Sequence, residues 1–121
     1  MAAKSKSTIP NRALSVRQPL AEKIITGEKN IEYRTIPVKL RGTIYIYASK
    51  TPNLEVYKQI KKEPGTFDVG VLVGTVEIVG CSEEPDNNDN YHWFLANPNR
   101  LRKPIIPDNH PQPVWFKPFK E

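Results

Sequence analysis

Four charged side chains in the N-terminal third of the chain could form one chemical site. Glu32 and Arg34 are two positions apart in a segment expected to be extended, which would turn both toward the same side, together with Asn30. There the carboxylate and the guanidinium can pair and still offer hydrogen-bonding groups to a ligand. Arg17 and Lys29 are the nearby cations. The alternative is a surface ion pair, which contributes little energy.

Lys29 is the best candidate for acid–base chemistry. It follows Gly27, which is placed to end a helix in the left-handed conformation and to hold the ammonium group over a cleft. Partial burial, or cations such as Arg17 and Arg34 nearby, would lower the lysine pKa and allow it to act as a general base. The alternative is a solvent-exposed turn lysine that binds phosphate as a point charge.

Glu77 is the second carboxylate with a possible chemical role. On an alternating strand its same-face neighbours would be Val71, Val73, Thr75 and Val79. A carboxylate in such a mostly apolar row needs a partner, which Arg34 or Lys29 could supply, and desolvation could raise its pKa. The alternative is an edge-strand glutamate whose face is open to water.

The remaining candidates would bind a ligand but would not take part in a reaction. Arg17 follows a predicted strand and precedes a predicted helix, where a guanidinium can bind a phosphate or a base edge, and Gln18 could add an amide contact. Tyr33 and Trp93 are aromatic candidates for base stacking, although most aromatic residues in so small a domain should be core. The histidines lack partners at metal-ligand spacing, so neither a metal site nor a cofactor is predicted.

The elements that must position these residues follow from periodicity. Alternation predicts strands at residues 13–17, 43–48, 70–80, 91–96 and 114–117, with an extended segment at 30–34. Helical spacing predicts a helix from Pro19 to Thr26 and a second one capped by Asn53. Prolines from Pro98 to Pro118 should exclude central strands there. At least five short strands and two helices favour a closed or partly closed β-barrel.

Length and charge limit the class of protein. The 121 residues suit one domain, predicted at 12–121 after a mobile basic arm at 1–11. A net charge of +5 favours polyanionic partners. No apolar stretch is long enough for a membrane span, and the N-terminus lacks the apolar region of a secretory signal, so a cytoplasmic protein without a membrane partner is expected. The single cysteine, Cys81, excludes an internal disulfide.

Several sequence blocks resemble one known family. Residues 14–19 (LSVRQP), 27–34 (GEKNIEYR), 41–50 (RGTIYIYASK) and 74–79 (GTVEIV), with Trp93 and residues 97–101 (NPNRL), are similar to the ASCH family, the activating-signal-cointegrator homology domains of the PUA-like folds. The resemblance implies an α+β fold: a small PUA-like β-barrel of about five to seven strands with two or three short helices. Two positions depart from the family: Leu20 replaces a common tryptophan, and the C-terminal end is unusually rich in proline.

The resemblance also implies functions. PUA-like folds are associated with RNA and modified-nucleotide recognition, so the favoured hypothesis is a nucleic-acid-binding module that holds RNA, or an extruded or modified nucleotide, in a basic cleft. The ligand-binding residues would be Arg17, Gln18, Asn30, Tyr33, Arg34, Ser49, Lys50 and Trp93.

The alternative hypothesis is a hydrolase of the ASCH type, either an acetylcytidine amidohydrolase or a ribonuclease. Lys29 matches the lysine of the amidohydrolases, but Glu32 stands in place of their threonine, which removes the hydroxyl nucleophile. Water activated by Glu32 or Glu77 would be the remaining route. A third possibility is a protein-interaction role for the proline-rich end and for an acidic loop that contains Glu83, Glu84, Asp86 and Asp89.

Overall fold

The computed structural model of the protein describes residues 9–120. Residues 1–8, which hold most of the predicted basic arm, lie outside the described residues. The elements follow in the order β1 (Ala13–Arg17), α1 (Leu20–Thr26), β2 (Ile31–Arg34), β3 (Gly42–Ser49), α2 (Leu54–Gln59), β4 (Val71–Cys81), β5 (Tyr91–Ile105) and β6 (Trp115–Phe116). In this part of the chain, no helix is long and apolar enough to cross a membrane.

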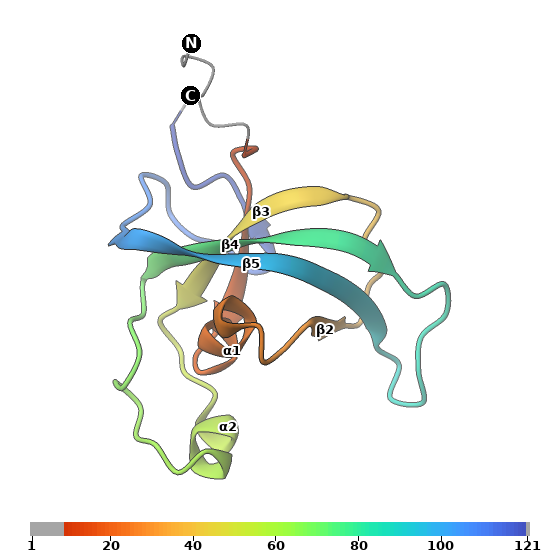
Figure 1. The fold of residues 1–121 in the computed structure, drawn as a ribbon, viewed down its shortest axis with the longest axis horizontal. Helices are drawn as coiled ribbons and strands as arrows, with labels where there is room; N and C mark the ends of the chain where they lie inside the picture. Colours follow the sequence, from red (N-terminus) through yellow and green to blue (C-terminus); the bar gives the residue numbers. More distant parts are fainter. Residues whose placement is uncertain (1–8, 121) are drawn as a thin grey trace.

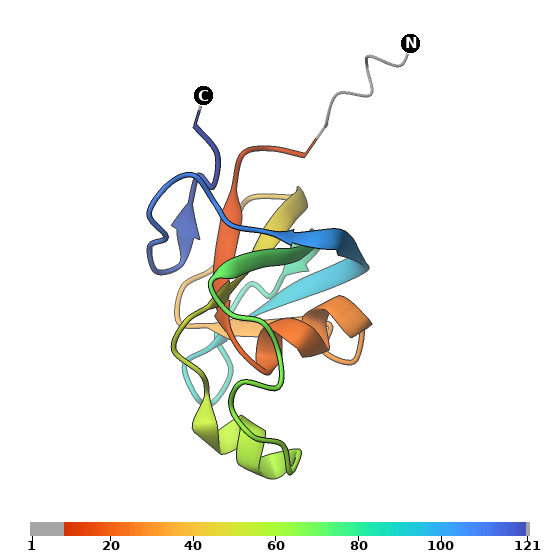
Figure 2. The ribbon, with the colours of Figure 1, turned by 90° about the vertical axis from the view of Figure 1, so that its left-hand side faces the viewer.

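The strands form one mixed sheet that curves into a half-barrel. Their order is β2-β5-β4-β3-β1-β6, with β1 and β3 parallel and the other pairs antiparallel. Figure 1 shows β3, β4 and β5 running side by side above α1, and Figure 2 shows β6, in dark blue, beside β1, in red. Six strands and two helices confirm the predicted small α+β barrel-like fold.

Helix α1 fills the inner side of the half-barrel. It ends where the sequence predicted, because Gly27 adopts the left-handed conformation with a φ of 88°. Its buried residues Ala21, Ile24 and Ile25 face the sheet. Gly74 on β4 permits this close approach: a Cβ atom there would lie 2.6 Å from the Ile25 Cδ1 atom. The C-terminal end of β1 and the segment after α1 are thereby fixed against the sheet.

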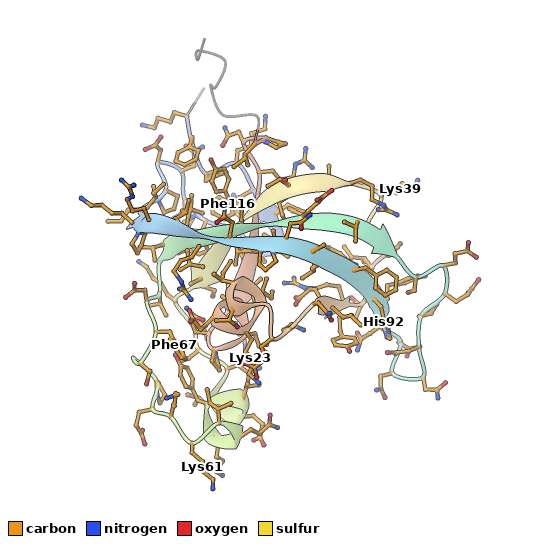
Figure 3. All side chains as sticks on the ribbon, in the orientation of Figure 1. Lys23, Lys39, Lys61, Phe67, His92 and Phe116 are labelled. Atoms are coloured by element: carbon orange, nitrogen blue, oxygen red, sulfur yellow. The ribbon has the colours of Figure 1, made fainter. Side chains whose placement is uncertain are left out.

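Helix α2 lies outside the barrel, at the bottom of Figure 1. The Asn53 side chain accepts a hydrogen bond from the Val56 amide at 3.1 Å, as the sequence predicted for this cap. Tyr57 is the buried residue of this helix. Lys61, just after it, points away from the barrel in Figure 3.

Strand β5 corrects one expectation. The prediction that prolines exclude central strands from Pro98 onward is wrong for β5, which continues to Ile105 between β2 and β4. The ladder is interrupted where the proline lies: Thr75 pairs with Asn99, but Glu77 pairs with Ala96, which leaves one extra residue on β5. This β-bulge accommodates a residue that has no amide to donate.

The two ends of the described chain are joined. The Asn11 side chain donates to the Phe119 carbonyl at 2.6 Å and accepts from the Phe119 amide at 2.9 Å. Asn11 was assigned to the predicted arm, yet these bonds attach it to the C-terminal segment. The pairing of β1 with β6 therefore extends beyond the strands themselves.

Candidate functional site

A cavity of about 610 Å³ opens beside β1, between strand β2 and a proline-rich segment that precedes β6. We call residues 110–114 the strap. The lining residues, as far as the structure describes them, are Ser15, Val16, Arg17, Leu20, Glu32, Arg34, Tyr47, Ser49, Lys50, Thr51, His110, Pro111, Gln112, Pro113 and Val114. The cavity thus joins segments from both ends of the chain.

Glu32 provides a buried carboxylate in this cavity. Glu32 is only 6% exposed. Strand β2 pairs antiparallel with β5, and this register places Glu32 opposite the fully buried Trp93, on the inner face of the sheet. One carboxylate oxygen accepts from Arg34 Nε at 2.6 Å, and the other lies 3.5 Å from Lys29 Nζ. A carboxylate removed from water requires such compensation by opposite charge.

Arg34 connects two distant strands of the sheet. Besides its bond to Glu32, it donates from Nη2 to the Ser15 carbonyl at 2.9 Å. Its guanidinium carbon also lies 5.9 Å from the centre of the Trp93 ring. Strand β2 is one edge of the sheet and β1 lies near the other edge, so this side chain spans the open side of the half-barrel.

Lys29 contacts Glu32, but it is not among the residues that line the cavity. Its ammonium group donates to the Ile31 carbonyl at 2.5 Å and lies 4.8 Å from the Tyr33 ring centre. Burial lowers the pKa of Lys29, and the neighbouring Glu32 carboxylate opposes that change. The predicted proximity of Lys29, Glu32 and Arg34 is therefore present, but the lysine is on the periphery of the space that a ligand would occupy.

The rim of the cavity is basic. Arg17 and Lys50 are exposed, and both line the cavity together with Ser49, which pairs with Arg17 across β1 and β3. The Lys50 stem packs over Gly70, where an added Cβ atom would lie only 3.0 Å from the lysine Cε. Hydroxyl groups of Ser15, Ser49 and Thr51 line the same space.

Glu77 lies apart from this group. It pairs with Ala96 on β5, three positions from Trp93, so the alternation of β5 assigns it to the opposite face of the sheet. Its carboxylate accepts from Asn97 Nδ2 at 2.8 Å, and the next residue on its row, Val79, is 49% exposed. This face is open to water at that end, as the alternative expected, but β4 lies between β3 and β5 and is not an edge strand.

Gln18 and Trp93 have structural contacts instead of places in the lining. Gln18 is 1% exposed, donates to the Asp68 carbonyl at 2.8 Å and accepts from the Glu22 amide at 2.9 Å, so it caps α1. Trp93 is fully buried, donates to the Ile36 carbonyl and stacks on Trp115. Neither offers a free surface to a ligand.

Tyr33 and Asn30 are exposed but outside the described lining. Tyr33 alternates with Glu32 and so faces outward, where its ring packs at a near right angle on the His92 ring.

His92 in turn lies 2.8 Å from an Asp86 oxygen, next to the acidic loop in Figure 3. Hydrogen bonds from His92 and from two backbone amides lower the pKa of Asp86. Within residues 9–120 no group of three or more His, Cys, Asp or Glu side chains is placed to hold a metal ion.

The sequence interpretation missed the strap and the inner lining. Val16, Leu20 and Tyr47 add apolar surface, and burial raises the pKa of the Tyr47 hydroxyl. The strap is attached to β1 at Ser15, whose hydroxyl donates to the Gln112 carbonyl and whose amide donates to the Val114 carbonyl. The unusual proline content was a visible signal, but it did not indicate where the segment would lie.

Comparison with known proteins agrees with this geometry. The model of the ASCH domain matches residues 14–105, which is most of the chain. The chain belongs to the ASCH family. The crystal structure of ASCH from Zymomonas mobilis is similar to this ASCH domain with a TM-score of 0.52 and 17% identity, over 78% of this chain and 71% of that one.

A second solved structure, a tyrosine-to-phenylalanine mutant of the Zymomonas mobilis protein, gives a TM-score of 0.51 and 15% identity, over 78% of this chain and 73% of that one. At these identities the two structures support the fold alone. No curated protein matches the chain by sequence. The family match ends at residue 105, so the strap lies beyond it.

Proposed function

We propose that this ASCH domain binds single-stranded RNA and takes one nucleotide into the cavity beside β1. The observation that carries the proposal is the combination of the buried Glu32 carboxylate, paired with the half-buried Arg34 inside the cavity, with exposed Arg17 and Lys50 at its rim. The volume of about 610 Å³ lies within the range of small-molecule sites. RNA-binding proteins commonly read unstacked bases in such pockets.

The rim and the interior would have different roles. Arg17 and Lys50 can neutralise backbone phosphates, which gives affinity that depends on salt but little on sequence. Arg34 and Glu32 offer a donor and an acceptor to the edge of a base. Because Arg34 also supports the sheet through Ser15, Arg17 is the better residue for testing the phosphate contact.

The test is the affinity of short single-stranded RNA measured against salt concentration. Arg17→Ala should weaken binding to all sequences and reduce the slope of log affinity against log salt by about one phosphate contact. Lys61→Ala removes an equally exposed charge at the distant α2 end and serves as the matched control. Absence of binding by the unchanged protein at low salt, or equal effects of the two variants, would contradict the proposal.

A hydrolase is the second candidate, favoured by the contact of Lys29 with Glu32 and by the lowered pKa of the lysine. The position of Lys29 outside the described lining and of Glu77 on the outer face argues against it. A screen of acetylated nucleosides and short RNAs, comparing the unchanged protein with Lys29→Ala, separates the two. Turnover that is lost in the variant would favour the enzyme.

A further inference from the structure

The strap supplies one side of the cavity although it lies outside the part of the chain that matches the family. Its five residues, 110–114, all line the cavity. The match to the ASCH model ends at residue 105. A ligand in the cavity therefore meets residues inside the family match on one side and a segment beyond that match on the other.

The conformation of the strap is held at a cost. Val114 has a φ of 64°, a left-handed conformation that is unfavourable for a β-branched side chain. Such strain persists only when surrounding contacts enforce it, and it is concentrated at functional sites. Here the contacts are the two hydrogen bonds from Ser15, at 2.8 Å to the Gln112 carbonyl and at 2.9 Å to the Val114 carbonyl.

The cavity needs a surface for the flat face of a base, and the predicted aromatic residues do not provide it. Trp93 is fully buried, and Tyr33 faces outward. Tyr47 and His110 also line the cavity, but Tyr47 is only 3% exposed. The rest of the apolar lining is aliphatic, from Val16 and Leu20 on one side and from Pro111 and Pro113 on the other. Pyrrolidine rings are rigid and apolar, so they can cover a base with little loss of entropy on binding.

We propose that the strap is the base-selecting wall of this cavity. A single nucleobase packs against the rings of Pro111 and Pro113, its edge meets Glu32 and Arg34, and the adjoining phosphate lies at Arg17 and Lys50. The inference rests on the proposed function and deepens it, because it assigns base preference to residues that are separate from the phosphate contacts.

The experiment measures the affinities of four homopolymeric RNA pentanucleotides, of A, C, G and U, at several salt concentrations. The double variant Pro111→Ala, Pro113→Ala should reduce the ratio between the best and the worst base by about tenfold, near the lower end of what aromatic side chains contribute by stacking on bases. Its salt dependence should stay that of the unchanged protein, because the phosphate contacts remain. Pro107→Ala changes the same residue type outside the described lining and should preserve the ratio.

The outcomes are distinguishable. No binding by the unchanged protein would contradict the proposed function itself. Binding without base preference, or a preference that the double variant retains, would overturn the inference and leave the function standing. Fluorescence of Trp115, which precedes Phe116 in β6 and stacks on Trp93, reports whether the variant keeps its fold. If the double variant does not keep its fold, the single variants His110→Ala and Gln112→Ala test the strap one side chain at a time.

Discussion

The two walls of the cavity are held by different kinds of contact. The β2 wall, Glu32 and Arg34, is mostly buried and is fixed by charged hydrogen bonds and by the adjacent Lys29. The strap has exposed residues at three of its five positions, and Ser15 attaches it by two hydrogen bonds. One wall is therefore fixed by charge pairing and the other by two neutral hydrogen bonds to β1.

The two walls also differ in their place relative to the family match. The β2 wall lies inside the family match, and the loss of the Glu32 charge would leave Lys29 and Arg34 without a counter-charge. The strap carries no charged pair in the described contacts. Val114 packs against the core, but His110, Gln112 and Pro113 are exposed and can change with little effect on the barrel. We expect stability to depend on the first wall and base preference on the second.

The largest expected effect is the loss of the Glu32 charge. Glu32→Gln leaves Lys29 and Arg34 without their counter-charge and should lower the free energy of unfolding by about 3–5 kcal/mol. Urea unfolding monitored by tryptophan fluorescence measures it. Glu28→Gln is the control, because the Glu28 side chain is 65% exposed and its pair with Lys23 should contribute no more than about 1 kcal/mol. Equal losses would show that the β2 wall is not fixed by charge.

A smaller effect is expected at the attachment of the strap. Ser15→Ala removes the hydroxyl bond to the Gln112 carbonyl and should lower stability by about 0.5–1.5 kcal/mol. Hydrogen exchange of the amide at residue 15, which donates to the Val114 carbonyl, should become faster. Thr66→Val removes a comparable bond, to the Glu63 carbonyl, without touching the strap. Unchanged exchange in the Ser15 variant would contradict the proposed attachment.

Features that depend on neighbouring residues were predictable from the sequence. Asn53 caps α2 and Gly27 ends α1 in the left-handed conformation, because both roles follow from local backbone chemistry. The shared side of Glu32 and Arg34 follows from alternation, and their pairing was also predicted. The number of short strands already favoured a barrel, and the family resemblance, confirmed over residues 14–105, supported the same fold.

Features that depend on distant contacts were not predictable. The burial of Gln18 depends on a bond to Asp68, 50 positions away, and the strap depends on bonds from Ser15 to residues almost one hundred positions later. Pro98 in β5 depends on a bulge against β4. The position of Trp93 on the inner face of the sheet follows from the register between β5 and β2, and no local pattern specifies that register.

The pH dependence of stability tests how strongly Lys29, next to the β2 wall, is shielded from water. Burial places the pKa of Lys29 in the folded state below the ordinary value of 10.5, which applies to the unfolded chain. At a pH between the two pKa values, the lysine is protonated in the unfolded chain and neutral in the folded one. The stability of the unchanged protein relative to Lys29→Met should therefore rise as the pH increases through that window. Urea unfolding at neutral pH and near pH 10 measures the difference, with Lys61→Met as the exposed control. A relative stability that falls with pH would mean that attraction to Glu32 outweighs desolvation.

The smallest effect is expected at Glu77, the carboxylate that lies on the outer face. Glu77→Gln retains an oxygen that can accept from Asn97, so its stability should remain within about 0.5 kcal/mol of the unchanged protein. RNA affinity and base preference should also remain the same, because the side chain meets neither wall. A loss of binding or turnover in this variant, with its fold intact, would mean that the ligand extends around the sheet edge to the outer face. The contrast between the two walls would then describe only part of the site.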